Sequence, residues 1–207
     1  MELTPQTTAA LIVHLQGDVI APDGALGDFF AANAQARNVV AGNNFLAEAV
    51  RAAGGTAVFT RVAFKPDYSD LVANCPLLAM VAQAGCLKDG SDKAELVPAL
   101  NVGGSDVVIT HQRFGGFTNS SLDLALRSRG ITTLLIGGVA TNMSVESTAR
   151  QASDLGYRTI VVADACSAAD DSAHEGALNN LGLLGEVSTI NEVRQALQHA
   201  AEPAPTR

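Results

Sequence analysis

Three kinds of feature are scarce in this sequence of 207 residues. The only cysteines are Cys75, Cys86 and Cys166, which are odd in number, widely spaced and without a C-x-x-C pair. Neither a disulfide framework nor a thiolate metal site is indicated, so we interpret all three as small buried apolar residues. Basic residues number 13 against 21 acidic ones, which gives a net charge of -8. A surface that follows the phosphates of a nucleic acid is therefore not expected.

Long apolar runs are also missing. The longest are interrupted well short of the length that a membrane span needs. Residues 1–6 lack the basic start and the apolar segment of a secretory leader. We therefore expect a cytoplasmic protein with no membrane partner and no nucleic-acid partner.

What is present is a composition typical of a globular protein with a sizeable core, because 47% of the residues are hydrophobic and 16% are charged. We predict a single domain over residues 1–201 and a frayed C-terminal tail over 202–207. Short apolar runs alternate with helical segments, which indicates a three-layer α/β sandwich: a mainly parallel six-stranded, Rossmann-like sheet with helices on both faces. The expected strands are 9–13, 56–62, 106–110, 132–136, 158–163 and 186–190, and the expected helices are 29–53, 120–128, 144–155, 172–184 and 191–200.

The most informative segment follows the fourth expected strand, over residues 137–150. A glycine turn there leads into a helix that we expect to begin at Ser144. Unpaired N–H groups at the start of a helix favour developing negative charge. The sequence therefore makes Ser144 a candidate nucleophile, although serine is also a common helix-start residue.

Two of the four histidines stand at the ends of other expected strands. His14 ends the first strand and His111 ends the third. In an open parallel sheet the ligand crevice lies outside the carboxyl ends of the strands. We therefore expect His14, His111 and Ser144 to share one site.

Four motifs in order resemble those of the isochorismatase-like hydrolases of the cysteine hydrolase superfamily, which include nicotinamidases, carbamoylsarcosine amidases and isochorismatases. They are LIVHLQGD at 11–18, HQRFGGFT at 111–118, GVATNMSVESTAR at 138–150, and VVADAC at 161–166 followed by His174. The resemblance covers nearly the whole chain. It implies a hydrolase that acts on an amide, an ester or a related bond of a small molecule.

The resemblance also implies a catalytic triad of aspartate, lysine and cysteine, but those three positions here are His14, His111 and Ser144. A serine hydroxyl needs a base to accept its proton, and a neutral imidazole can serve. We therefore predict a Ser-His-His site in which either histidine is the base. By resemblance, the backbone N–H groups of Ala140 and Ser144 form an oxyanion hole beside a cis peptide after the valine.

Two alternatives stay open. In the first, as in some isochorismatases, His14 protonates a vinyl ether without a covalent intermediate. Arg113, Phe114 and Phe117 would then hold a carboxylated substrate, with Asn142 as a further substrate neighbour. In the second, the chain is a non-catalytic family member that binds a small molecule or a protein.

No cofactor and no metal are expected. The chain lacks the Asp-x-His metal motif of the nicotinamidases, and we assign Asp18 to the organisation of a loop. About forty residues with Pro66, Pro76 and Pro98 separate the second and third strands, which suggests a covering loop or an oligomer contact. By resemblance we expect a homo-oligomer, a dimer or a tetramer. We assign His174 to the start of the penultimate helix.

Overall fold

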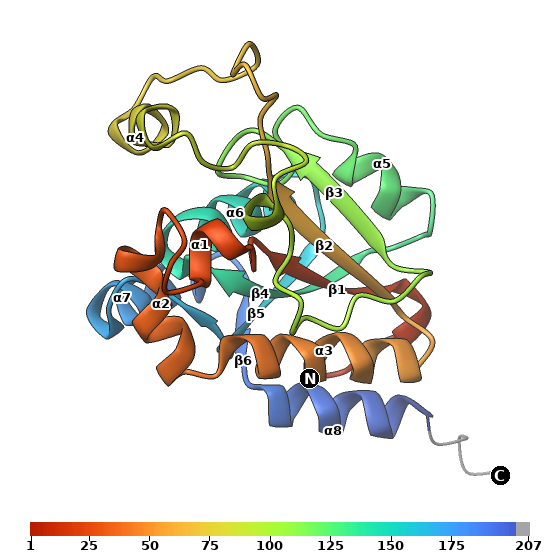
Figure 1. Ribbon diagram of the computed structural model, residues 1–207. Helices are drawn as coiled ribbons and strands as arrows, with labels where there is room; N and C mark the ends of the chain where they lie inside the picture. The colour runs from red at the N-terminus through yellow and green to blue at the C-terminus, as the bar shows by residue number, and fades with distance from the viewer. Residues whose placement is uncertain (202–207) are drawn as a thin grey trace, which may run out of the picture.

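The computed structural model, which describes residues 1–201, contains one sheet of six parallel strands (Figure 1). Their order is β3-β2-β1-β4-β5-β6, so the chain starts in the middle of the sheet and adds strands first on one side and then on the other. The predicted α/β sandwich is confirmed. The strands are β1 (Thr8–Val13), β2 (Thr56–Val62), β3 (Val107–His111), β4 (Thr133–Val139), β5 (Arg158–Ser167) and β6 (Glu186–Ser188).

Helices cover both faces of the sheet and bury two apolar clusters. On β1, Ala10 and Ile12 belong to the cluster under α2, α3 and α8, whereas Leu11 and Val13 belong to the cluster under α5, α6 and α7. Every residue of β1 is buried because alternate side chains enter opposite layers. The helices are α2 (Gly27–Ala36), α3 (Val39–Ala52), α5 (Leu122–Arg127), α6 (Glu146–Asp154), α7 (Asp171–Leu181) and α8 (Ile190–Ala201).

The prediction of a single helix over 29–53 is wrong, since two helices, α2 and α3, occupy this region. They meet at Asn38, which has a φ of 51° in the left-handed region. Asparagine tolerates this conformation better than most residues do. The preceding Arg37 donates to the backbone carbonyl of Cys166 at 3.0 Å, a contact between distant segments that apolar periodicity does not reveal.

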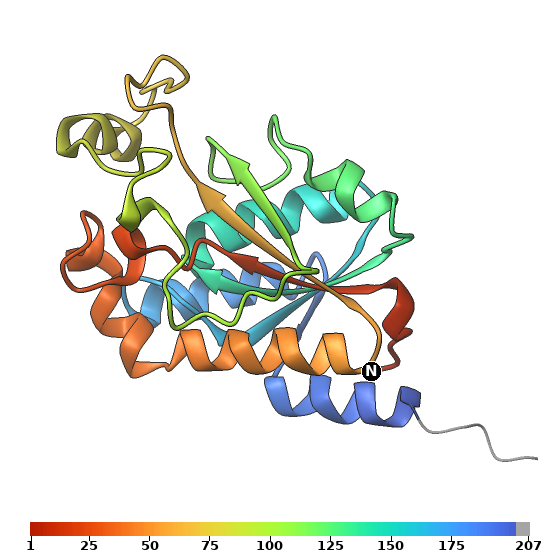
Figure 2. The same cartoon turned by 45° about the vertical axis from the view of Figure 1, so that its right-hand side comes forward.

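The long connection after β2 holds more structure than the predicted loop. It contains the helix α4 (Pro76–Ala84) and a short 3-10 turn, η2 (Asp92–Ala94). In Figure 2 the α4 region stands beyond the end of β2, at the edge of the sheet where the strands finish. Two further short helices, η1 (Pro5–Thr7) and α1 (Gly17–Ile20), flank β1. Across residues 1–201 no helix is both long enough and apolar enough to cross a membrane; the tail predicted over 202–207 lies outside the described residues.

Candidate active site

The two strand-end histidines meet across the end of β2. His14 follows β1, and its φ of 54° turns the chain away from the strand. His111 is the last residue of β3, on the other side of β2. The Nε2 atoms of the two rings are 2.9 Å apart, a hydrogen-bond distance, and the ring centroids are 4.9 Å apart. The structure therefore brings these two histidines into contact.

Ser144 lies in the turn that follows β4. Gly138 pairs with Val13 where β4 lies beside the end of β1, and this position requires glycine, because its φ is 123° and an added Cβ would lie 2.1 Å from the carbonyl oxygen of Val13. The chain then passes the cis peptide between Val139 and Ala140 and enters a π-helical turn, η3 (Thr141–Val145). Ser144 thus lies inside this turn, two residues before Glu146, the first residue of α6, and is not the first residue of an α-helix.

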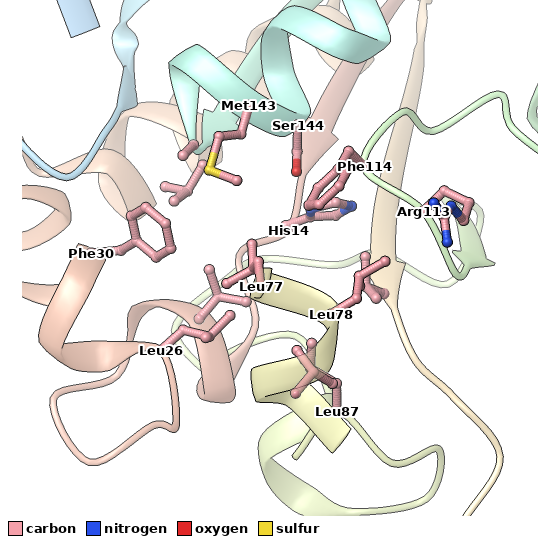
Figure 3. A pocket seen from close by; sticks show the side chains of 15 residues that line it. His14, Leu26, Phe30, Leu77, Leu78, Leu87, Arg113, Phe114, Met143 and Ser144 are labelled. Atoms are coloured by element: carbon pink, nitrogen blue, oxygen red, sulfur yellow. The ribbon is translucent and has the colours of Figure 1, made fainter. Parts of the chain in front are cut away.

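Ser144 and His14 line the same cavity, which has a volume of about 50 Å³. Both residues are buried, with 7% and 5% of their surfaces exposed. Figure 3 shows the Ser144 hydroxyl projecting from the η3–α6 segment on the side where His14 and Phe114 lie. His111 is fully buried and does not line the cavity. Within residues 1–201 the Ser144 hydroxyl makes no hydrogen bond, so neither histidine holds it in this structure.

Burial sets the protonation state of the histidine pair. Burial, followed by the neighbouring His111, holds the pKa of His14 well below its usual range. Burial also lowers the pKa of His111 to about 4, an effect that the backbone of Arg113 partly opposes. Both rings are therefore neutral near pH 7. Their Nε2–Nε2 hydrogen bond then needs one ring to donate a proton and the other to accept it.

The backbone around Ser144 leaves a donor for an oxyanion. No acceptor in the described range 1–201 pairs with the N–H of Ala140, the residue after the cis peptide. Its carbonyl, in contrast, accepts from Met143 at 3.0 Å and from Val145 at 3.1 Å. These two bonds to the carbonyl fix the turn. The N–H of Ala140 takes no part in them and has no acceptor within residues 1–201.

Two of the four predicted substrate-binding residues reach the cavity and two do not. Arg113 and Phe114 line it. Phe117 instead packs against Tyr157, with ring centroids 5.7 Å apart, in the apolar cluster under α6. Asn142 is exposed, and its neighbour Met143 lines the cavity.

His174 is held from both sides. Its Nδ1 lies 2.8 Å from Thr141 Oγ1, and its Nε2 lies 2.7 Å from a guanidinium nitrogen of Arg37. Since arginine only donates, Nε2 must accept and Nδ1 must donate to the threonine. Burial and then Arg37 lower the pKa of His174. His174 thus ties α7 to the turn that carries Ser144 and does more than fix the start of its own helix.

Asp18 has the loop role expected of it. Its buried carboxylate accepts from the backbone N–H of Leu87 at 2.8 Å. Gln16 similarly holds the end of β2, since its side-chain amide donates to the carbonyl of Val62 and accepts from the N–H of the same residue, both at 2.8 Å. In the part of the chain that the structure describes, no three histidine, cysteine or acidic side chains are grouped as metal ligands.

The sequence did not predict which apolar residues form the wall of the cavity. Much of it comes from the connection after β2, through α4 and the residues that follow it. A signal was available, since Pro76 in the first turn and Gly85 just after the last residue are typical of helix ends. The wall includes Leu26, Phe30, Leu77, Leu78, Val81 and Leu87.

Comparison with known proteins identifies the family. The model of the isochorismatase domain matches residues 8–192. The chain belongs to the isochorismatase family of hydrolases. It is 37% identical over 173 residues to the uncharacterized isochorismatase family protein YwoC of Bacillus subtilis, with 84% of each chain covered. It is also similar to the ureidoacrylate amidohydrolase RutB of Methylobacterium radiotolerans, at 34% identity over 94% of this chain and 81% of the relative.

Solved structures give the same fold. A cysteine hydrolase from Pseudomonas syringae pv. phaseolicola superposes with a TM-score of 0.88 and 27% identity, over 97% of this chain and 96% of the other. The expected family membership and the expected fold are therefore confirmed. By the resemblance, the position of the family's cysteine nucleophile is Ser144 in this chain.

Proposed function

We propose that this member of the isochorismatase family hydrolyses an amide-type bond of a small molecule, with Ser144 as nucleophile and His14 as base. The observation that carries the proposal is that Ser144 and His14 line one cavity while His111 hydrogen-bonds to Nε2 of the His14 ring. A nucleophile, a base and a group that orients the base are the parts that acyl transfer requires. The name of the related ureidoacrylate amidohydrolase favours an amide-type substrate.

The hydrogen bond between the histidines selects the reacting nitrogen. Because Nε2 of His14 is engaged with His111, Nδ1 is the nitrogen left to accept a proton. For Nδ1 to carry a lone pair, His14 must donate through Nε2 to Nε2 of His111. The proton of His111 then sits on its own Nδ1, a buried atom without a partner in residues 1–201.

Each step then follows from these positions. The Ser144 oxygen attacks the substrate carbonyl carbon, its proton passes to Nδ1 of His14, and the carbonyl electrons move to the oxygen. The N–H groups of Ala140 and Ser144 stabilise this oxyanion by about 3 kcal/mol. The carbon–nitrogen bond breaks, and the leaving nitrogen takes the proton from His14. Water then releases the acyl group by the same route. Substrate binding must first bring the Ser144 hydroxyl within reach of His14.

Protonation of the same pair supports a second candidate. A charged His14 carries a proton on each nitrogen, donates through Nε2 to Nε2 of His111 and keeps a proton on Nδ1 for transfer. Because burial holds the pKa of His14 well below its usual range, the charged ring is a strong acid, and it would protonate a vinyl ether without a covalent intermediate and return to its neutral form.

One experiment separates the two mechanisms. A fluorophosphonate probe should add to Ser144, as measured by intact mass and peptide mapping, and Ser144→Ala should lose both the label and the turnover of a panel of small amides. Ser147→Ala, one turn further along α6, serves as the matched control and should retain both. Failure to label, together with unchanged turnover in Ser144→Ala, removes the covalent mechanism and favours proton donation. Neither label nor turnover on amides or vinyl ethers favours the non-catalytic binding protein.

A further inference from the structure

The cavity that Ser144 and His14 share is walled almost entirely by hydrocarbon. Twelve of the fifteen residues that line it are apolar, and the three exceptions are His14, Arg113 and Ser144. Ser144 and His14 belong to the proposed reaction. The guanidinium of Arg113 already donates to the carbonyl of Val72 at 3.1 Å and to Oδ1 of Asn74 at 2.9 Å. Few groups on the wall are therefore left to bind a polar part of a ligand.

The apolar side chains of the wall come from separate segments of the chain. Phe30 lies on α2, Leu26 lies just before it and Leu78 lies on α4, and all three are buried. In Figure 3 Leu26 and Phe30 lie to one side of Ser144, and Arg113 lies to the other. The part of the cavity beside Leu26 and Phe30 is therefore without a polar side chain. A polar group bound there would lose its hydrogen bonds to water and gain none in return.

We propose that the acyl part of the substrate is a short, uncharged aliphatic chain, which binds in the apolar part of the cavity beside Leu26 and Phe30. The orientation rests on the proposed function. The carbonyl must lie at Ser144 and the leaving nitrogen must take its proton from His14, so the acyl chain is left with the apolar side. Each CH2 group buried there strengthens binding by about fourfold.

The volume of the cavity limits the length of that chain. A water-sized group needs roughly 10–15 Å³ of such a volume, and a CH2 group is similar in size to a water molecule. The cavity of about 50 Å³ therefore holds about four such groups. We expect the affinity to rise with the length of the acyl chain up to about four or five carbons and not beyond.

The test measures binding to the Ser144→Ala protein by NMR titration, so that turnover plays no part. The probes are the unbranched amides from acetamide to heptanamide, and methoxyacetamide, which has the shape of butyramide with an ether oxygen in place of one CH2 group. The affinity should rise by about fourfold per CH2 group from acetamide to butyramide and level off by hexanamide. Butyramide should bind at least about fivefold more tightly than methoxyacetamide, because the ether oxygen finds no donor in the apolar part of the cavity.

Variants of Leu77 place this binding in the cavity. Leu77 lines the cavity but is only half-buried, so its replacement costs less stability than that of a fully buried leucine. Added to Ser144→Ala, Leu77→Ala should move the point where the affinity levels off to a longer chain. Leu77→Asn keeps a similar shape but puts an amide in the wall, and it should reduce the preference for butyramide over methoxyacetamide to below about twofold. Leu124→Ala and Leu124→Asn change a leucine of α5 that is 71% exposed and lies outside the cavity, and both should leave the binding series unchanged.

Three results would overturn the proposal. They are equal binding of butyramide and methoxyacetamide, an affinity that does not change with chain length or no binding of butyramide and valeramide at tens of millimolar, and an unchanged binding series in folded Leu77 variants. Failure of the proposed function has a different signature. Loss of Ser144 labelling by the fluorophosphonate would leave the binding series intact, because that series is measured without the Ser144 hydroxyl.

Discussion

Two buried histidine sites lie beside the turn that carries Ser144, and they differ in how completely their nitrogens are used. At His174 both ring nitrogens have partners, Arg37 and Thr141. At the other site His14 and His111 share one hydrogen bond, and Nδ1 of His111 has no partner within residues 1–201. Burial lowers the pKa at both sites, so desolvation alone does not distinguish them.

This difference in hydrogen-bond partners indicates which of the two sites can change the position of its proton. The tautomer of His174 is fixed, because Arg37 can only donate to it, and a second proton on the ring would break that contact. The pair of His14 and His111 can hold its proton in either of two arrangements. Buried polar groups are normally satisfied, so a buried nitrogen without a partner is an exception that calls for an explanation. The proton transfer that we propose for His14 would explain the exception at His111, whereas the contacts of His174 call only for a structural role.

Removing the cavity histidine should produce the largest effect. In His14→Asn the proposed base is lost, and we expect kcat/KM on the best substrate to fall by roughly 10²–10⁴-fold while the protein remains folded. Steady-state kinetics with thermal denaturation provide the measurement. His199→Asn changes an exposed histidine on α8 and should leave kcat/KM unchanged. A loss below tenfold in His14→Asn would remove His14 from the proton transfer and make the two histidine sites equivalent.

Acid should weaken the fold through His111. The pKa of this ring is about 4 in the folded protein and about 6.5 in the unfolded chain, so the unfolded chain binds more protons between these values. The free energy of unfolding should therefore fall as the pH drops through that window, by about 3 kcal/mol from His111 alone. Urea denaturation at pH 7 and at pH 4.5 measures the change. His111→Gln should lose this share of the pH dependence, and an unaltered dependence in that variant would contradict the assignment.

At His174 the effect should appear in stability more than in turnover. His174→Ala leaves Arg37 and Thr141 without one hydrogen bond each, which should lower the free energy of unfolding by about 2 kcal/mol. For a chain of this length that corresponds to a melting temperature lower by roughly 4–8 °C. The expected loss of kcat/KM, measured well below the melting temperature, is less than tenfold. A loss as large as that of His14→Asn would show that the contrast between the two sites is false.

The sequence predicted the sheet and the two strand-end histidines, because both depend on local patterns. Apolar runs of five to seven residues fix the strands, and parallel strands bring their carboxyl ends to one edge, so His14 and His111 had to lie near each other. The motif around Ser144 gave the family by resemblance. These features need no knowledge of which helix packs against which.

The predictions that were wrong concern features that depend on contacts between distant segments. The break at Asn38 coincides with the contacts of Arg37 to Cys166 and His174, which no local pattern encodes. The π-helical form of the turn at Ser144 puts Met143 in the cavity and Asn142 outside it, a direction that an expected helix start could not supply. The helix α4 carried its own end signals, but its place in the cavity wall follows only from the fold.

The smallest effect is expected for Asn142, which lies on the turn between the two histidine sites. Asn142 lies on the turn between Thr141, which bonds to His174, and Ser144, which lines the cavity, yet its own side chain is exposed and makes no hydrogen bond to another of the residues 1–201. Asn142→Ala should therefore change kcat/KM by less than twofold and the free energy of unfolding by no more than about 0.5 kcal/mol. Kinetics and denaturation of this variant beside Met143→Ala, which alters the cavity wall, provide the comparison. A large loss in Asn142→Ala alone would mean that substrate reaches the outer face of the turn, and the site would then extend beyond the cavity that His14 and Ser144 share.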